Sequence, residues 1–257
     1  MKTLLAAGFS PIDLKGLNKK ASMLKRTDQK YLLQEHELAS LIETLQSRFF
    51  ILEHEGRRVF QYESAYFDDK YQSYLQHHQG RRRRLKIRTR LYADCELCYL
   101  EVKTKGVRGR TIKHRMQYPA EERRTLNTKA LVFINDICVK YGVAPPERLA
   151  EKVIVRFDRI TLVAKRGRER VTIDANVRFR HDNKGYDAPE GLLIVETKTR
   201  SGNGVADKLL RRHHIRPQAG CSKYCIGVAR LGLVKKKNNF LPVLKKIHQS
   251  GRQSAST

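Results

Sequence analysis

The segment from Arg81 to Tyr92 reads RRRRLKIRTRLY, and in its latter part every second residue is a base. The bases are Arg84, Lys86, Arg88 and Arg90, and the residues between them are Leu85, Ile87, Thr89 and Leu91. Because successive side chains of a β-strand point to opposite faces, this alternation predicts a strand with four cations on one face. Like charges about 7 Å apart along a strand repel one another. We therefore expect a polyanion beside this face.

The whole chain is strongly basic. Its 257 residues include 53 Lys and Arg against 26 Asp and Glu, a formal net charge of +27. Such a charge favours nucleic acid, anionic lipid, polyphosphate or an acidic protein as partner, and does not choose among them. Hydrophobic residues make up 40% of the chain, which is enough to build a folded core. No apolar run reaches the length of a membrane span, so we expect none.

The cysteines and the start of the chain bear on its location. The chain has five cysteines, and an odd number fits reduced thiols of the cytoplasm better than a disulfide framework. The opening MKTLLAAGFSPIDLKG is a poor secretory signal, since Ser10, Pro11 and Asp13 interrupt its apolar stretch. The pairs Cys95/Cys98 and Cys221/Cys225 resemble halves of a zinc site, but their spacing is loose and we expect free thiols.

Hydrophobic periodicity divides the rest of the chain into strands and helices. Helices are predicted over 36–49, 125–141 and 208–214, and a short helix or turn over 70–78. Strands are predicted over 23–33, 57–69, 81–92, 98–106, 111–118, 152–164, 171–179 and 192–199. About eight strands, mostly in hairpins, predict an α+β fold with a mainly antiparallel sheet that could close into a barrel. We expect one domain over 21–232, a weakly ordered lead over 1–20 and a basic, mobile tail over 233–257.

Several strands repeat the one-sided charge of the opening segment. The shared-face sets are Glu101, Lys103 and Lys105; Lys113 and Arg115; Glu196 and Lys198; and Arg170, Thr172 and Asp174. A half-exposed antiparallel sheet would explain any one of these strands. A solvated face normally mixes the two signs, however, and here bases dominate. A barrel lined by Lys and Arg, with two or three carboxylates for a metal, would explain the whole set.

Six short motifs then occur in an order typical of one family. They are YFDD at Tyr66–Asp69, the KIRTRLY run at 86–92, LEVK at Leu100–Lys103, TID at Thr172–Asp174, VETK at Val195–Lys198 and SKY at Ser222–Tyr224. The chain resembles the VTC domain, the polyphosphate polymerases of the vacuolar transporter chaperone type, and looks like a bacterial member. This family is part of the triphosphate tunnel metalloenzyme, or CYTH-like, superfamily. The resemblance covers the chain from about Lys25 to Arg230.

This resemblance implies a closed, eight-stranded β-barrel with flanking helices, whose tunnel binds ATP and inorganic polyphosphate. It implies an ATP-dependent polyphosphate polymerase that transfers the γ-phosphate to a growing chain with Mn²⁺ or Mg²⁺. The implied catalytic residues are Lys30, Arg88, Arg90, Arg159, Arg170 and Glu196. The further phosphate-binding residues are Arg84, Lys86, Lys103, Lys113, Arg115, Lys198, Ser222 and Lys223. Glu196 is the first candidate metal ligand and Glu101 the second.

One motif departs from the superfamily pattern. The E-x-E-x-K strand reads Arg26-Thr27-Asp28-Gln29-Lys30, which argues against hydrolysis of small triphosphates and leaves few metal ligands. Three alternatives to the polymerase stay open: a non-catalytic module that binds polyphosphate or inositol phosphates, a triphosphatase of the same fold, and nucleic-acid binding. Specific nucleic-acid binding is disfavoured because Trp is absent and aromatic residues do not cluster on the basic strands. Export of a product would need a membrane partner, which the sequence does not identify.

Overall fold

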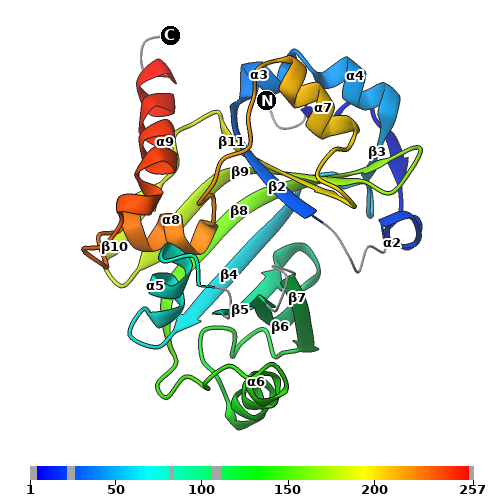
Figure 1. Cartoon of the computed structure of the whole chain (residues 1–257). Helices are drawn as coiled ribbons and strands as arrows, with labels where there is room; N and C mark the ends of the chain where they lie inside the picture. Colours follow the sequence, from blue (N-terminus) through cyan, green and yellow to red (C-terminus); the bar gives the residue numbers. More distant parts are fainter. Residues whose placement is uncertain (1–4, 22–26, 82–83, 106–110, 255–257) are drawn as a thin grey trace.

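A large, strongly bent antiparallel sheet dominates the computed structural model, which describes residues 5–21, 27–81, 84–105 and 111–254 (Figure 1). Its main path has the strand order β2-β11-β9-β8-β4-β5-β6-β7. In that order the strands are β2 (Thr27–Gln34), β11 (Leu192–Thr199), β9 (Arg170–His181), β8 (Ala150–Ala164), β4 (Phe60–Asp68), β5 (Arg84–Tyr92), β6 (Leu97–Lys105) and β7 (Thr111–Gln117). Off this path, β10 (Lys184–Asp187) pairs with β9, and β1 (Ser10–Ile12) pairs with β3 (Phe49–Leu52), which pairs with β8.

The closed eight-stranded barrel predicted above is wrong. Strands β2 and β7 stand at the two ends of the path, and within the described residues they do not pair with each other. The sheet is therefore open. Alternation along a strand fixes which face a side chain takes, but not whether two end strands meet, because closure depends on tilt and stagger summed over all strands.

Helices cover the outer face of the sheet in two places, where the apolar residues of the strands point. Helices α3 (Glu35–Ala39), α4 (Ile42–Arg48) and α7 (Val205–Arg212) pack on one end of the sheet, over residues such as Tyr31 and Ile173. Helix α6 (Thr128–Lys140) packs on the other end, over residues such as Ile87 and Leu100 (Figure 1). The helix predicted over 36–49 is thus two short helices, and that predicted over 125–141 is confirmed as α6.

The inner face is covered only in part. Helix α8 (Lys223–Arg230) packs on it against β8 and β9, together with α5 (Gln72–His78) and the short helix η3 (Asn238–Phe240). Gly227 makes the close approach of α8 possible, since a Cβ there would lie 2.6 Å from the ring of Phe179. A further short helix, η1 (Ala93–Cys95), joins β5 to β6.

Regular structure lies within both the predicted lead and the predicted tail. Within the lead, β1 pairs with β3, and α2 (Leu14–Ala21) buries Leu17 against Leu52 and Val163. Within the tail, α9 (Leu241–Ser254) buries Val243, Leu244 and Ile247 in the α8 core. Residues 241–254 of the predicted tail thus form a helix, because these apolar residues recur at helical spacing. None of the described helices is long and apolar enough to cross a membrane.

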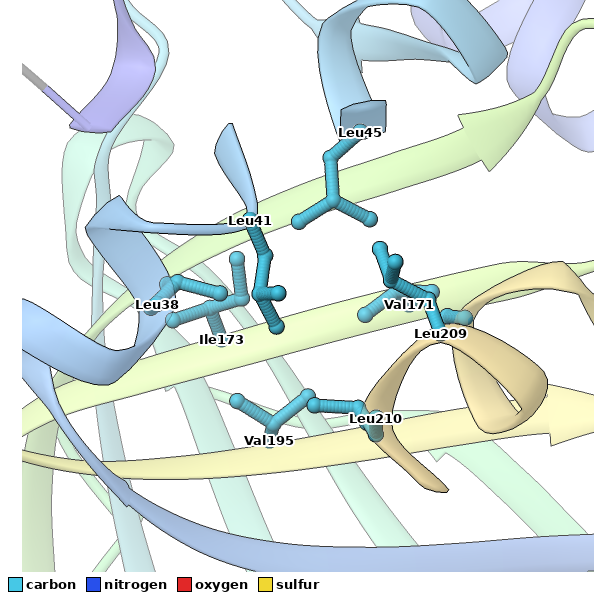
Figure 2. Close-up of a pocket in the computed structure, with 9 residues that line it drawn as sticks. Leu38, Leu41, Leu45, Val171, Ile173, Val195, Leu209 and Leu210 are labelled. Carbon is cyan, nitrogen blue, oxygen red and sulfur yellow. The ribbon is translucent and has the colours of Figure 1, made fainter. Parts of the chain in front are cut away.

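Figure 2 shows a small pocket inside the outer core, between α3, α4, α7 and the sheet. Its lining is entirely apolar and consists of Leu38, Leu41, Leu45, Val171, Ile173, Val195, Ala206, Leu209 and Leu210. Its volume of about 10 Å³ is close to the minimum that one water molecule needs. This pocket is a packing defect of the core and lies on the face opposite to the charged residues.

Candidate functional site

The predicted cations gather on the inner face of the sheet. Directly opposed residues of an antiparallel pair share a face, so the register traces this face from strand to strand. It runs through the pairs Lys30↔Glu196, Lys198↔Arg170, Asp174↔Arg159, Tyr62↔Tyr92, Arg88↔Glu101 and Glu101↔Arg115. We call this surface the basic face; its cations are Lys30, Arg84, Lys86, Arg88, Arg90, Lys103, Lys113, Arg115, Arg159, Arg170 and Lys198.

The sheet curls so that distant strands face each other across the basic face. Strands β6 and β11 are five positions apart in the strand order, yet Glu196 acts electrostatically on Lys103. Lys30 of β2 likewise acts on Lys86 of β5. The basic face is therefore the concave side of the curled sheet, and its charges converge from several sides.

Three acids of this face each hold two cations; Glu101 and Asp174 are buried and Glu196 is partly buried. Glu101, which is 1% exposed, accepts hydrogen bonds from Arg88 (Nε, 2.8 Å) and from Lys113 (Nζ, 3.0 Å). Burial opposes its ionisation, but the charges of Arg88, Arg90 and Lys113 outweigh burial and hold the pKa of Glu101 well below its usual range. Glu101 is thus an anion that positions two of the predicted phosphate ligands.

Asp174 plays the same part on β9. It accepts a bidentate pair of hydrogen bonds from Arg159, at 2.5 and 2.8 Å, and pairs with Lys223 at the first turn of α8. Burial works against the charge, yet Arg159 and Lys223 hold the pKa of Asp174 well below normal. The alternation along the strand predicted the face of Asp174 correctly but indicated no role for it. Only its register with Arg159 identifies it as the anchor of two predicted site residues.

Glu196 completes the set on β11. Its carboxylate lies 2.6 Å from Nζ of Lys198 and 3.8 Å from Nζ of Lys30. Burial again opposes the charge, and Lys198, Lys30 and Lys103 together hold the pKa of Glu196 well below its usual value. The predicted catalytic residue Lys30 and the predicted phosphate ligand Lys198 are therefore both held by the predicted metal ligand.

Three other cations have no carboxylate partner within the described residues. Arg90 donates only to Ser64 (3.2 Å), and Lys86 donates to Ser222 (2.9 Å), while no hydrogen bond or ion pair to a described residue is seen for Lys103. Burial lowers the pKa of Arg90 and lowers that of Lys86 to about 8. The charge of Arg88, with burial, lowers the pKa of Lys103 well below normal. For these three cations, burial and the neighbouring positive charges outweigh the attraction of the acids nearby.

The remaining predicted ligands lie toward the margins of the basic face. Arg84 is partly buried and Arg115 is exposed, with its guanidinium 4.7 Å over the ring of Tyr99. Arg170 stands at the α2 end, where its Nη2 lies 3.5 Å from Oδ1 of Asn18. Ser222 is the N-cap residue of α8 and meets Lys86. Residue Arg26 of the departing motif lies outside the described residues.

Two of the sequence motifs meet as a structural unit behind Arg88. The hydroxyl of Tyr66 accepts a hydrogen bond from Arg88 (2.9 Å), and its ring stacks on Tyr224 at 5.2 Å between centroids. Tyr224 in turn donates to Asp68 (2.5 Å), which also accepts from the backbone of Ser73 at the start of α5. The YFDD and SKY motifs thus fix the position of Arg88, a role that their spacing in the sequence does not reveal.

Aromatic residues also lie among the bases, contrary to the sequence-based prediction. Tyr62 and Phe157 stack at 5.3 Å, and the guanidinium groups of Arg90 and Arg159 lie 5.0 to 5.8 Å from their ring centroids. Strand register brings these rings to the basic face from β4 and β8. The rings come from strands far apart in sequence, so no local pattern could show the cluster.

The acids do not supply a dedicated metal site. Glu101, Asp174 and Glu196 lie on three different strands, and each is already neutralised by two cations. Within the described part of the chain, no three His, Cys, Asp or Glu side chains gather as ligands would. The residues present therefore do not fit a resident Mn²⁺ or Mg²⁺ ion, which needs free carboxylate oxygens.

The cysteines are free thiols, as the sequence predicted. Cys98 is buried in the α6 core on the outer face, whereas Cys221 and Cys225 are buried in the α8 core on the inner face. The two pairs that resemble zinc half-sites thus lie on opposite faces of the sheet.

Comparison with known proteins identifies the domain. The sequence model described as the VTC domain matches residues 25–232. No curated protein is significantly similar in sequence. An adenylyl cyclase candidate from Hippeastrum, described as having a dominant triphosphatase activity, shares 15% identity at a TM-score of 0.48, covering 80% of this chain and 96% of that chain. A protein of Pyrococcus horikoshii shares 12% at a TM-score of 0.45, covering 80% and 99%.

Proposed function

Because the chain belongs to the VTC domain family, we propose that it is an ATP-dependent polyphosphate polymerase whose basic face binds ATP and inorganic polyphosphate. One observation carries this proposal: Lys86, Arg90 and Lys103 lie together on the basic face and, among the described residues, none of them has a carboxylate within hydrogen-bond or ion-pair distance. Cations held in this way, with depressed pKa values, are stabilised by an anion that brings several charges at once. A chain of phosphates is such an anion.

The chemistry of phosphoryl transfer suits these residues. The reaction asks a protein mainly to position the reactants and to neutralise charge on the transferred phosphoryl group. Arg90 offers a planar fork for two phosphate oxygens, and Lys86 and Lys103 act as point charges. Lys30, Arg88, Arg159 and Lys198 are already oriented by carboxylates, so they would meet the phosphates in fixed positions. No nucleophilic side chain is needed when the acceptor is phosphate itself.

The remaining predicted residues would have supporting roles in this proposal. Arg84, Lys113, Arg170, Ser222 and Lys223 would contact phosphates further along a bound chain, whereas Arg115, which lies over the ring of Tyr99, would contact the nucleoside part of ATP. Glu101 and Glu196 would act by orienting their cations. Mn²⁺ or Mg²⁺ would be carried in by the nucleotide, since metal-bound ATP needs few protein ligands. We assign no step of the reaction to the metal.

The test is to incubate purified protein with ATP and Mn²⁺ and to read product length on a gel. Long polyphosphate is expected from the unaltered chain and from Arg178→Ala, a control on the exposed part of β9. Arg90→Ala is expected to lower product formation at least tenfold. If the unaltered chain releases only phosphate and ADP, it is a triphosphatase. If it binds polyphosphate without consuming ATP, it is a binding module.

A further inference from the structure

Three half-buried tyrosines form a continuous cluster at one end of the basic face. The rings of Tyr62 and Tyr92 are 4.9 Å apart, and those of Tyr92 and Tyr99 meet edge-on at 6.1 Å. Arg115 lies over Tyr99 at 4.7 Å and is itself exposed. Neighbouring strands supply these residues in register, since Tyr62 stands opposite Tyr92, and Tyr99 stands opposite Arg90. The cluster is therefore built by four adjacent strands, β4 to β7.

The cluster begins where the unpaired cations end. Tyr99 faces Arg90 across β5 and β6, and Tyr92 follows Arg90 by two residues on the same face, a step of about 7 Å. A ligand with phosphates at Arg90 and Lys103 would thus reach the tyrosines with its next chemical group. The tyrosines carry no charge, so that group would not be another phosphate.

Among the described residues, the opposite end of the basic face offers no comparable surface. Beyond Lys86 the basic face is covered by the first turn of α8, whose Tyr224, Cys225 and Ile226 are buried in an apolar core. A flat group attached to the phosphates would be excluded there. At the tyrosine end, Tyr62, Tyr92 and Tyr99 all keep part of their surface accessible.

We propose that Tyr62, Tyr92 and Tyr99, with Arg115, form a stacking site for the base of the nucleotide whose phosphates the basic face holds. This proposal rests on the proposed function and adds to it the orientation of ATP on the basic face, with the base at the tyrosine end. Aromatic rings and Arg planes are the surfaces on which proteins stack bases. Stacking tolerates any base, so ATP and GTP should bind with similar affinity.

The experiment compares a ligand that has a base with one that lacks it. Dissociation constants of a non-hydrolysable ATP analogue and of inorganic tripolyphosphate are measured by calorimetry on the full chain. Tyr99→Leu is expected to weaken binding of the analogue about tenfold, the scale of one lost base stack, and to change tripolyphosphate binding less than twofold. Tyr99→Phe, which keeps the ring, should bind both ligands as the unaltered chain does.

A matched control is Tyr186→Leu. Tyr186 also has a ring contact, with Phe179 at 6.1 Å, and a cation at 5.1 Å, Arg230, but it lies on the edge strand β10. This control should bind both ligands normally, and thermal melting checks that each variant is folded.

The outcomes separate the two proposals. If Tyr99→Leu and Tyr92→Leu weaken the binding of both ligands equally, the base site is overturned and phosphate binding stands. The same conclusion follows if these variants weaken the binding of neither ligand. If the unaltered chain binds neither ligand, the proposed function is overturned and the base site with it.

Discussion

Arg88 and Glu101 face each other across β5 and β6, and Arg88 donates two hydrogen bonds to a single carboxylate oxygen of Glu101. Arg88 donates a third hydrogen bond, from Nη1, to the hydroxyl of Tyr66. Arg90 is two residues further along the same face and donates only to Ser64. The two arginines of one motif therefore differ in what they do, since Arg88 is fixed by the protein and Arg90 retains most of its donors.

Replacing Arg88 should damage the fold. Arg88→Ala leaves Glu101 buried with only Lys113 as a direct partner, and breaking a buried pair from one side costs about 3–5 kcal/mol. We expect a loss of that order in the free energy of unfolding, measured with urea. The double variant Arg88→Ala/Glu101→Gln should lose less than the sum of the two single variants. Additive losses would contradict the proposed pairing.

Replacing Arg90 should damage binding instead. Arg90→Ala removes a cation that Arg88 and Arg159 repel, so the urea midpoint should stay the same or rise. Polyphosphate affinity should fall about tenfold or more, since a hydrogen bond to a charged group contributes roughly 1.5–3 kcal/mol. A variant that unfolds more easily but binds normally would refute this division of roles.

Stability should fall in acid, and Asp174 should contribute to the loss. Its pKa is lowered in the folded state, so its contribution is present above the unfolded pKa, near 4, and is lost as the pH falls below it. Asp174→Asn should lower stability at pH 7 and flatten the acid part of the curve. Urea unfolding at pH 7, 5 and 3.5 measures both effects. If the unfolding free energy of Asp174→Asn and that of the unaltered chain fall in parallel with pH, Asp174 does not contribute to the loss.

Phosphate binding should weaken in mild alkali. Burial lowers the pKa of Lys86 to about 8 in the free protein, and a bound anion favours the charged form. Tripolyphosphate affinity should therefore fall as the pH rises from 7 to 9, and binding at pH 8 should take up protons. Calorimetry in two buffers of different ionisation enthalpy detects this uptake. Lys86→Arg should reduce the uptake, because an arginine stays protonated throughout this range.

Removal of divalent metal should spare binding. Because the acids of the basic face already hold cations, the phosphates should be bound by Lys and Arg directly. We expect the dissociation constant of polyphosphate to change less than threefold when EDTA is added. Loss of product formation from ATP in EDTA would not contradict this prediction, which concerns binding alone. A much larger loss of binding in EDTA would place a metal ion between protein and phosphate.

The sequence predicted the faces of the strands well. The alternation from Arg84 to Arg90 put four cations on one side of β5, and the same rule placed Glu101, Asp174 and Glu196 correctly. Helical spacing located α6, and the segment predicted as a short helix or turn contains α5. The same reasoning missed α9, although Val243, Leu244 and Ile247 carry a helical pattern, because the surrounding lysines suggested a mobile tail.

Which cations pair directly with an acid, and which do not, could not be predicted from the sequence. Lys103 and Lys113 both lie on the basic face, yet only Lys113 meets Glu101 closely. The choice depends on which side chain the curl of the sheet brings within about 3 Å, and local sequence does not encode that distance. For the same reason no local pattern indicated a role for Asp174, whose partners come from β8 and α8.

The sequence by itself determined the β-period, the side of each strand that carries charge and the excess of bases, since these follow from side-chain type and backbone alternation. Only the tertiary structure decided that the sheet stays open, that three acids each hold two cations, and that Lys86, Arg90 and Lys103 have no acid of their own within the described residues. The physical reason is distance. Electrostatic pairing is set by separations of a few ångströms between strands far apart in the chain, and these exist only once the sheet has curled.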